Sequence, residues 1–222
     1  MPLAKIHLQK LLMLFYAPNN LRIEKLRADI RQELKRERGD SEGGGDFYTP
    51  FWSDAKAHVS GTADLRVLSG DRIDNNRRRR NLYPRLTDGF LDYWNEKRRW
   101  RNEPFELIPS SPRARFPIPE LDAVVKVENL LTIRIGGQED RIIYPYFSKE
   151  PALPSEGARI GLWLLDQALK GYRLEDMRIL DILRSASFGT IDYPLHGDER
   201  DLFLQKYDHV LREWKKLKED YE

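Results

Sequence analysis

The stretch from residue 122 to residue 183 constrains the fold more than any other part of the chain. Two apolar runs, at 133–135 and 142–147, are joined by a short glycine-containing turn. A segment that is apolar on almost every side follows at 155–169, and residues 177–183 have the composition of a further strand. A strand, a buried helix and a strand form a right-handed crossover whose outer strands are parallel. We therefore expect a mixed α/β (α+β) fold, with a small mixed sheet packed on helices.

The composition limits the chemistry that this chain can carry out. It has 222 residues, of which 40% are apolar and 33% charged, so it can bury a core and keep a solvated surface. The absence of cysteine excludes disulfides, thiolate zinc sites and cysteine nucleophiles, and fits a reducing compartment. No apolar run reaches the roughly 18 residues of a membrane span. Because His7, Gln9 and Lys10 interrupt the apolar N-terminal stretch, we predict a helix there, not a signal peptide, and a cytoplasmic protein without membrane contact.

The Gly-rich segment at 39–46 is the clearest linker in the sequence. Two helical patterns precede it, Leu3–Tyr16 and Leu21–Arg38, separated by a Pro-Asn-Asn turn. The predicted organisation is therefore a helical hairpin at 1–38, a flexible linker at 39–46 and a main α/β domain at 47–222.

Basic residues are concentrated in the first half of the chain. Residues 1–120 have a formal charge of +6 and residues 121–222 a charge of −4. Two basic clusters, at 77–80 and 97–101, lie at the ends of a predicted helix about 30 Å long that spans residues 82–101. Arginines and lysines on one face contact phosphates, and aromatic side chains between them stack on bases. The candidate nucleic-acid-binding residues are Arg77, Arg78, Arg79, Arg80, Lys97, Arg98, Arg99, Trp100 and Arg101. Alternatively, these cations interact favourably with a helix dipole or form ion pairs with the acidic second half of the chain.

A possible metal site lies just after the linker. Asp54 and His58 share a helix face at i,i+4, and Asp64 follows a turn at Gly61. Two carboxylates and an imidazole can bind a divalent metal. The competing interpretation is a hydrogen-bonded histidine in an aromatic cluster, and we predict no metal and no cofactor.

The predicted C-terminal helix, Asp198–Glu222, carries one apolar seam. Its apolar residues recur every three or four positions, which resembles a heptad pattern over less than three heptads. The seam either binds a second copy or another protein, or packs inside its own domain. Its residues are Phe203, Tyr207, Val210, Trp214, Leu217 and Tyr221.

Three strands are predicted before the buried helix: Arg113–Ile118, Val124–Ile135 and Arg141–Phe147. From Leu82 to Leu183 the predicted order is then helix, three strands, helix, strand. This order resembles the αβββαβ core of PD-(D/E)XK nuclease-like proteins.

That family's motif of acidic metal ligands and a lysine is not matched in this chain. The second strand offers only Glu128, and the third reads Ile-Tyr-Pro-Tyr-Phe at 143–147. Lys149 lies just beyond the third strand, in a shifted position. The resemblance therefore implies the fold without the nuclease chemistry, unless a migrated site uses Glu128 and Lys149.

The sequence favours a non-catalytic, cytoplasmic protein that binds DNA or RNA through the arginine-rich region. One alternative is an assembly subunit that uses the C-terminal seam. The other is a metal-dependent hydrolase or nuclease with a non-standard site, built from Asp54, His58 and Asp64 or from Glu128 and Lys149.

Overall fold

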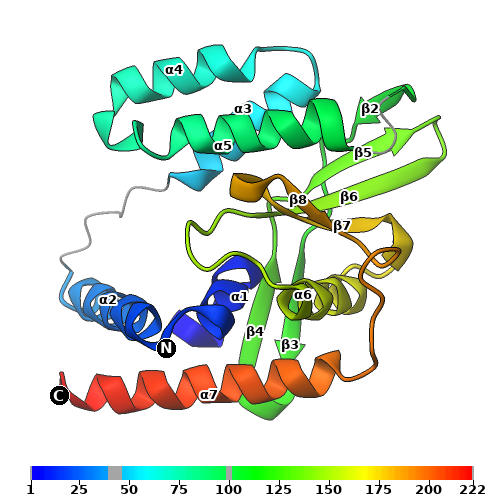
Figure 1. Cartoon of the computed structure of the whole chain (residues 1–222). Coiled ribbons are helices and arrows are strands. Elements are labelled where there is room, and N and C mark those ends of the chain that lie inside the picture. Colours follow the sequence, from blue (N-terminus) through cyan, green and yellow to red (C-terminus); the bar gives the residue numbers. More distant parts are fainter. Residues whose placement is uncertain (1, 40–46, 99–101, 222) are drawn as a thin grey trace.

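The computed structural model describes residues 2–39, 47–98 and 102–221. Within these ranges the chain folds into α-helices and two mixed sheets, which confirms the expected α+β class (Figure 1). The α-helices are α1 (Leu8–Tyr16), α2 (Asn19–Glu37), α3 (Tyr48–Val59), α4 (Leu65–Asn75), α5 (Tyr83–Asp92), α6 (Ser155–Ala168) and α7 (Glu199–Glu219). The strands are β1 (Lys5–His7), β2 (Phe105–Leu107), β3 (Ala114–Ile118), β4 (Ala123–Val127), β5 (Leu131–Ile135), β6 (Glu139–Tyr146), β7 (Met177–Asp181) and β8 (Ala186–Phe188).

The larger sheet has the strand order β2-β5-β6-β7-β8 and lies between two helical layers. Successive side chains of strand β6 point to opposite faces of the sheet, so each face packs on a different helical layer. Ile142 and Tyr144 pack into a core with α1, α6 and α7, whereas Ile143 packs into a second core with α3 and α5. In Figure 1, helices α3, α4 and α5 lie above this sheet and α1, α6 and α7 lie below it.

The predicted crossover is confirmed. Strands β6 and β7 pair in parallel, with Tyr144 opposite Ile179, and α6 connects them. The turn before β6 is also confirmed, since Gly136 and Gly137 have φ values of 56° and 74°, which favour glycine.

The prediction of one long strand over Val124–Ile135 is wrong. The segment forms β4, which pairs with β1 and β3 in the smaller sheet, and β5, which pairs with β2 and β6 in the larger one. Between them, Asn129 adopts a left-handed conformation with a φ of 63°. The indole N–H of Trp52 donates to the carbonyl oxygen of Asn129, which holds the chain where it passes from one sheet to the other.

The N-terminal segment packs with the rest of the protein. Residues 5–7, expected to be helical, form β1, which pairs in parallel with β4. Leu8, Leu12 and Leu26 are fully buried in the same core as α6 and α7. Helices α1 and α2 therefore share a core with α6 and α7. Of the predicted linker, residues 40–46 lie outside the described part of the chain.

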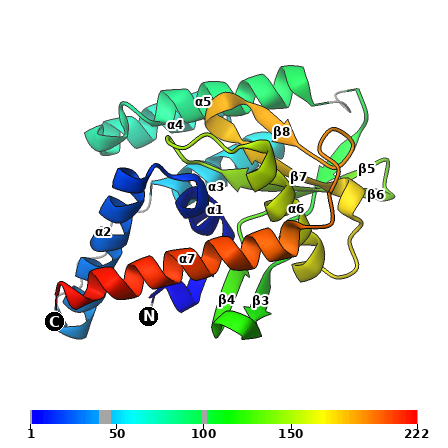
Figure 2. The same cartoon turned by 60° about the horizontal axis from the view of Figure 1, so that its bottom comes forward.

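Helix α7 runs across α6, α1 and α2 (Figure 2). Phe203 and Tyr207 are fully buried, and the Phe15 ring meets the Phe203 ring edge-on with centroids 5.8 Å apart. Val210 and Trp214 are also buried, and Leu217 is half-buried. The seam therefore packs inside its own chain, which is one of the two alternatives that its sequence left open. In the described ranges, no helix combines the length and the apolar character needed to cross a membrane.

Candidate functional site

The arginine run lies in the tight connection between α4 and α5. A short 3-10 helix, Arg77–Arg79, forms this connection, and the Asn76 side chain accepts a hydrogen bond from the Arg78 backbone N–H at 3.1 Å. The Arg77, Arg78 and Arg80 side chains are exposed, and in the described ranges none of them has an ion-pair or hydrogen-bond partner. The connection therefore presents three neighbouring guanidinium groups to solvent.

Arg79 has a different role from its three neighbours. Its guanidinium lies over the rings of Tyr83 and Phe47, 5.3 Å and 5.8 Å from their centroids, and donates to the carbonyl oxygen of Arg72 at 3.3 Å. Cation–π contacts of this kind stabilise the fold. Arg79 therefore fastens the turn and leaves the other three side chains projecting from it.

The second basic cluster lies at the other end of α5, which continues as a π-helix, Tyr93–Lys97. Lys97 pairs with Asp92 at 2.7 Å, and this hydrogen bond, aided by one from Ser185, holds the pKa of Asp92 below its ordinary value. The Arg98 guanidinium lies over the rings of Trp94 and Phe105, at 4.0 Å and 5.2 Å. Lys97 and Arg98 thus make contacts within the fold. The other residues predicted for this cluster, Arg99, Trp100 and Arg101, lie outside the described residues.

The candidate metal ligands near α3 each have a structural contact. Asp54 is buried and accepts two hydrogen bonds of 3.0 Å from Arg72. Asp64 caps α4 by accepting from the backbone N–H of Arg66 at 2.8 Å, and the His58 ring faces the N–H of Leu65 at 3.4 Å. Among residues 2–39, 47–98 and 102–221, no three His, Cys, Asp or Glu side chains are grouped so as to hold a metal. The sequence pattern did not reveal that Asp54 faces Arg72.

A cavity of about 620 Å³ lies where the two sheets and the N-terminal helices meet. The sequence pointed to two of its residues, Glu128 and Lys149, but not to the cavity itself. They come from the β4–β5 connection and from the loop after β6, and are brought together only by the fold. The charged and aromatic residues of the wall are His7, Lys10, Lys25, Tyr48, Trp52, Glu128, Tyr144, Phe147, Lys149 and Glu150.

The cavity wall at 148–153 is anchored by a buried acid. Asp181 is 1% exposed, accepts from the N–H of Leu153 at 3.1 Å and pairs with Arg184 at 3.1 Å. Arg184 also donates to the carbonyl oxygens of Ser148 and Lys149, at 3.0 Å and 2.6 Å. Burial raises the pKa of Asp181, against the opposing effects of the Leu153 N–H and Arg184. The loop that carries Lys149 is thereby fixed to the end of β7.

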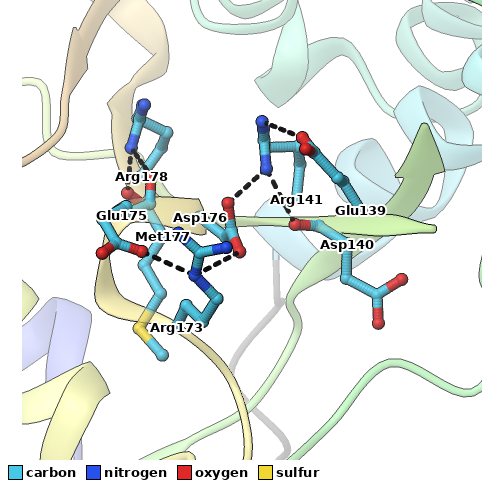
Figure 3. A network of polar contacts seen from close by, with 8 residues as sticks. All are labelled: Glu139, Asp140, Arg141, Arg173, Glu175, Asp176, Met177 and Arg178. Atoms are coloured by element: carbon cyan, nitrogen blue, oxygen red, sulfur yellow. Dashed lines mark hydrogen bonds and ion pairs between the residues drawn. The ribbon is translucent and has the colours of Figure 1, made fainter. Parts of the chain in front are cut away.

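A denser polar cluster lies at the opposite end of β6 (Figure 3). Arg141 pairs with Asp176 and, at 2.7 Å, with Glu139, while Arg173 pairs with Glu175 at 2.8 Å. Every charge drawn into these pairs has an opposite charge beside it, so the cluster fastens β6 to the start of β7.

No protein-family model matches this sequence, and none of the curated proteins searched is significantly similar to it.

Proposed function

We propose that this protein binds nucleic acid through the exposed arginines between α4 and α5. The proposal rests on one observation. The side chains of Arg77, Arg78 and Arg80 are exposed and have no partner within the described ranges. The competing interpretation needs these cations to pair with acidic residues of the same chain. No such pair involves them in the described part of the protein.

The electrostatics of the surrounding surface support the same ligand. Residues 71–85 contain six arginines and two aspartates. Arg85, near the start of α5, is also exposed without a partner in the part of the chain that the structure describes. Guanidinium groups form paired hydrogen bonds with phosphate oxygens, and neutralising phosphates releases counterions from the nucleic acid. A polyanionic backbone is the ligand that uses several such groups at once.

The alternatives have less support. An assembly subunit would use the α7 seam, whose residues Phe203, Tyr207, Val210 and Trp214 are buried. A hydrolase using Asp54, His58 and Asp64 would have to break the contacts that these residues make in the fold. The resemblance to the PD-(D/E)XK core stays a prediction, and no activity is assigned through it.

The test compares wild-type protein with a variant carrying Arg77→Gln, Arg78→Gln and Arg80→Gln. Binding of labelled single- and double-stranded DNA and RNA is measured between about 50 and 200 mM salt, where phosphate contacts show their salt dependence. The wild-type affinity should fall steeply with salt. The slope of log affinity against log salt should decrease by about 2 to 3 in the variant, since each phosphate contact contributes about 0.7 to 0.9.

The matched control changes three other exposed cations, as Lys35→Gln, Lys215→Gln and Lys216→Gln, and so alters the net charge equally. It should retain most of the wild-type slope. No binding of any of the four nucleic acids by the wild-type protein at 50 mM salt would refute the proposal. So would an equal loss of slope in the control.

A further inference from the structure

The cavity between the sheets and the N-terminal helices has unpaired groups of both charges. Glu128 is half-buried and Lys149 is exposed, and neither side chain has an ion-pair or hydrogen-bond partner in the described residues. A partly buried carboxylate loses hydration, and this loss is offset only when donors replace the water. The cavity therefore suits a ligand that brings donors to Glu128 and negative charge to Lys149.

The remaining lining adds further charged and aromatic side chains. Lys10, from α1, and Lys25, from α2, are paired with Asp29 at 2.6 Å and with Glu24 at 3.7 Å, so Lys149 is the lysine of the lining that has no acidic partner in the described residues. Glu150 is the second acid in the lining. Tyr48 stacks on Phe147 with ring centroids 5.0 Å apart, and both rings line the same cavity. An aromatic wall favours a planar ring, and a volume of about 620 Å³ lies within the roughly 300–1,000 Å³ of small-molecule sites.

Both walls are held in place before any ligand binds. The Asn129 carbonyl, next to Glu128, accepts a hydrogen bond from buried Trp52. On the other side, Asp181 and Arg184 hold the loop that carries Lys149. The hydroxyl of Ser148 donates to the carbonyl oxygen of Glu150 at 2.8 Å, which further orders this loop. These contacts order the backbone on both sides of the cavity, so binding has to order little more than the side chains themselves.

We infer that this cavity binds a guanine nucleotide, with Lys149 at the phosphate and Glu128 at the base. A nucleotide joins a planar base to an anionic phosphate, so it meets both requirements in one molecule. The guanine edge offers adjacent N–H donors, from N1 and N2, and a carboxylate has two oxygens to accept them. This site is separate from the arginine surface and does not depend on the nucleic-acid function proposed above.

The experiment is calorimetric titration of the full chain with GMP, AMP and ribose 5-phosphate. GMP should bind more tightly than AMP, and both more tightly than ribose 5-phosphate. Glu128→Gln and Lys149→Gln should each weaken GMP binding by about tenfold or more, because each removes a charge-assisted hydrogen bond. The controls Glu37→Gln and Lys215→Gln change exposed groups of the same type on α2 and α7, and should stay within about twofold of wild type.

Three outcomes would overturn the inference. They are a GMP dissociation constant weaker than about 1 mM, ribose 5-phosphate or AMP binding as tightly as GMP, and GMP affinity unchanged in both cavity variants. Thermal unfolding of each variant shows whether it is folded, and Glu128→Gln keeps the shape of the side chain. The variant with glutamine at 77, 78 and 80 should retain GMP binding, so this result and the nucleic-acid result can fail separately.

Discussion

The two ends of α5 both carry basic clusters, and the structure uses the described residues of each in a different way. At the first end, Arg77, Arg78 and Arg80 project into solvent without partners in the described part of the chain. At the second end, Lys97 pairs with Asp92, and Arg98 lies over Trp94. Charge density along the sequence is similar at the two ends. The comparison shows that a basic run has charges available to a ligand only where the fold leaves them unpaired.

The largest effect on stability is expected from a substitution that displaces α5, the helix whose two ends carry the basic clusters. A Cβ added at Gly89 would lie 1.9 Å from the carbonyl oxygen of Ile182, which is backbone and cannot move aside easily. We expect Gly89→Ala to destabilise the protein by about 3 kcal/mol, because overpacking forces α5 away from the short 3-10 helix Ile182–Arg184 that follows β7. Chemical denaturation measures the change.

Gly70→Ala in α4 is the matched control, because an added Cβ there meets nothing within 4 Å. Alanine has the higher helix propensity, so this variant should be more stable by about 0.5–1 kcal/mol. Equal destabilisation by both substitutions would show that the contact with Ile182 does not fix α5.

A smaller effect on the unfolding free energy distinguishes the two basic clusters directly. Arg98→Gln removes a guanidinium that packs on the rings of Trp94 and Phe105, and should cost about 1 to 2 kcal/mol of unfolding free energy. Arg78→Gln removes an exposed side chain and should cost less than about 0.5 kcal/mol. Thermal or urea unfolding of the two variants tests this order, and the reverse order would contradict the comparison.

The smallest expected effect is a pH dependence of folding stability that comes from the second end of α5, where Lys97 pairs with Asp92. The pKa of Asp92 is lowered chiefly by the hydrogen bond from Lys97. A carboxyl whose pKa is lower in the folded protein contributes stability above its unfolded pKa, about 3.9, and loses it as the pH falls through the folded value. The stability difference between wild type and Asp92→Asn should therefore shrink as the pH is lowered from 6 to about 3. A difference that stays constant over this range would show that Lys97 does not hold Asp92 ionised.

Local patterns predicted much of the fold because they report on neighbouring residues. The apolar run at 142–147, the apolar segment at 155–169 and the further strand pattern at 177–183 together predicted the crossover. The same reasoning failed at 124–135, where alternation continues in both strands although the chain passes from one sheet to the other at Asn129. Periodicity records which face of a strand is buried and does not record which sheet the strand joins.

The site residues show the same limit. The sequence pointed to Glu128 and Lys149 only as a displaced nuclease pair. The cavity that Glu128 and Lys149 line is formed by segments far apart in the chain, from His7 to Glu150. The anchoring of Lys149 by Asp181 and Arg184 also joins residues more than thirty positions apart. No local pattern contains such contacts.

The sequence by itself determined the α+β class, the crossover, the long C-terminal helix and the places where charge is concentrated. These follow from residue spacing and composition, which act over a few residues. Long-range packing is what turns the α7 seam inward, pairs Asp54 with Arg72 and leaves three arginines of one run without partners among the described residues. The physical reason is that burial and ion pairing depend on which distant segments come together, and charge pairing acts over a few ångströms of space.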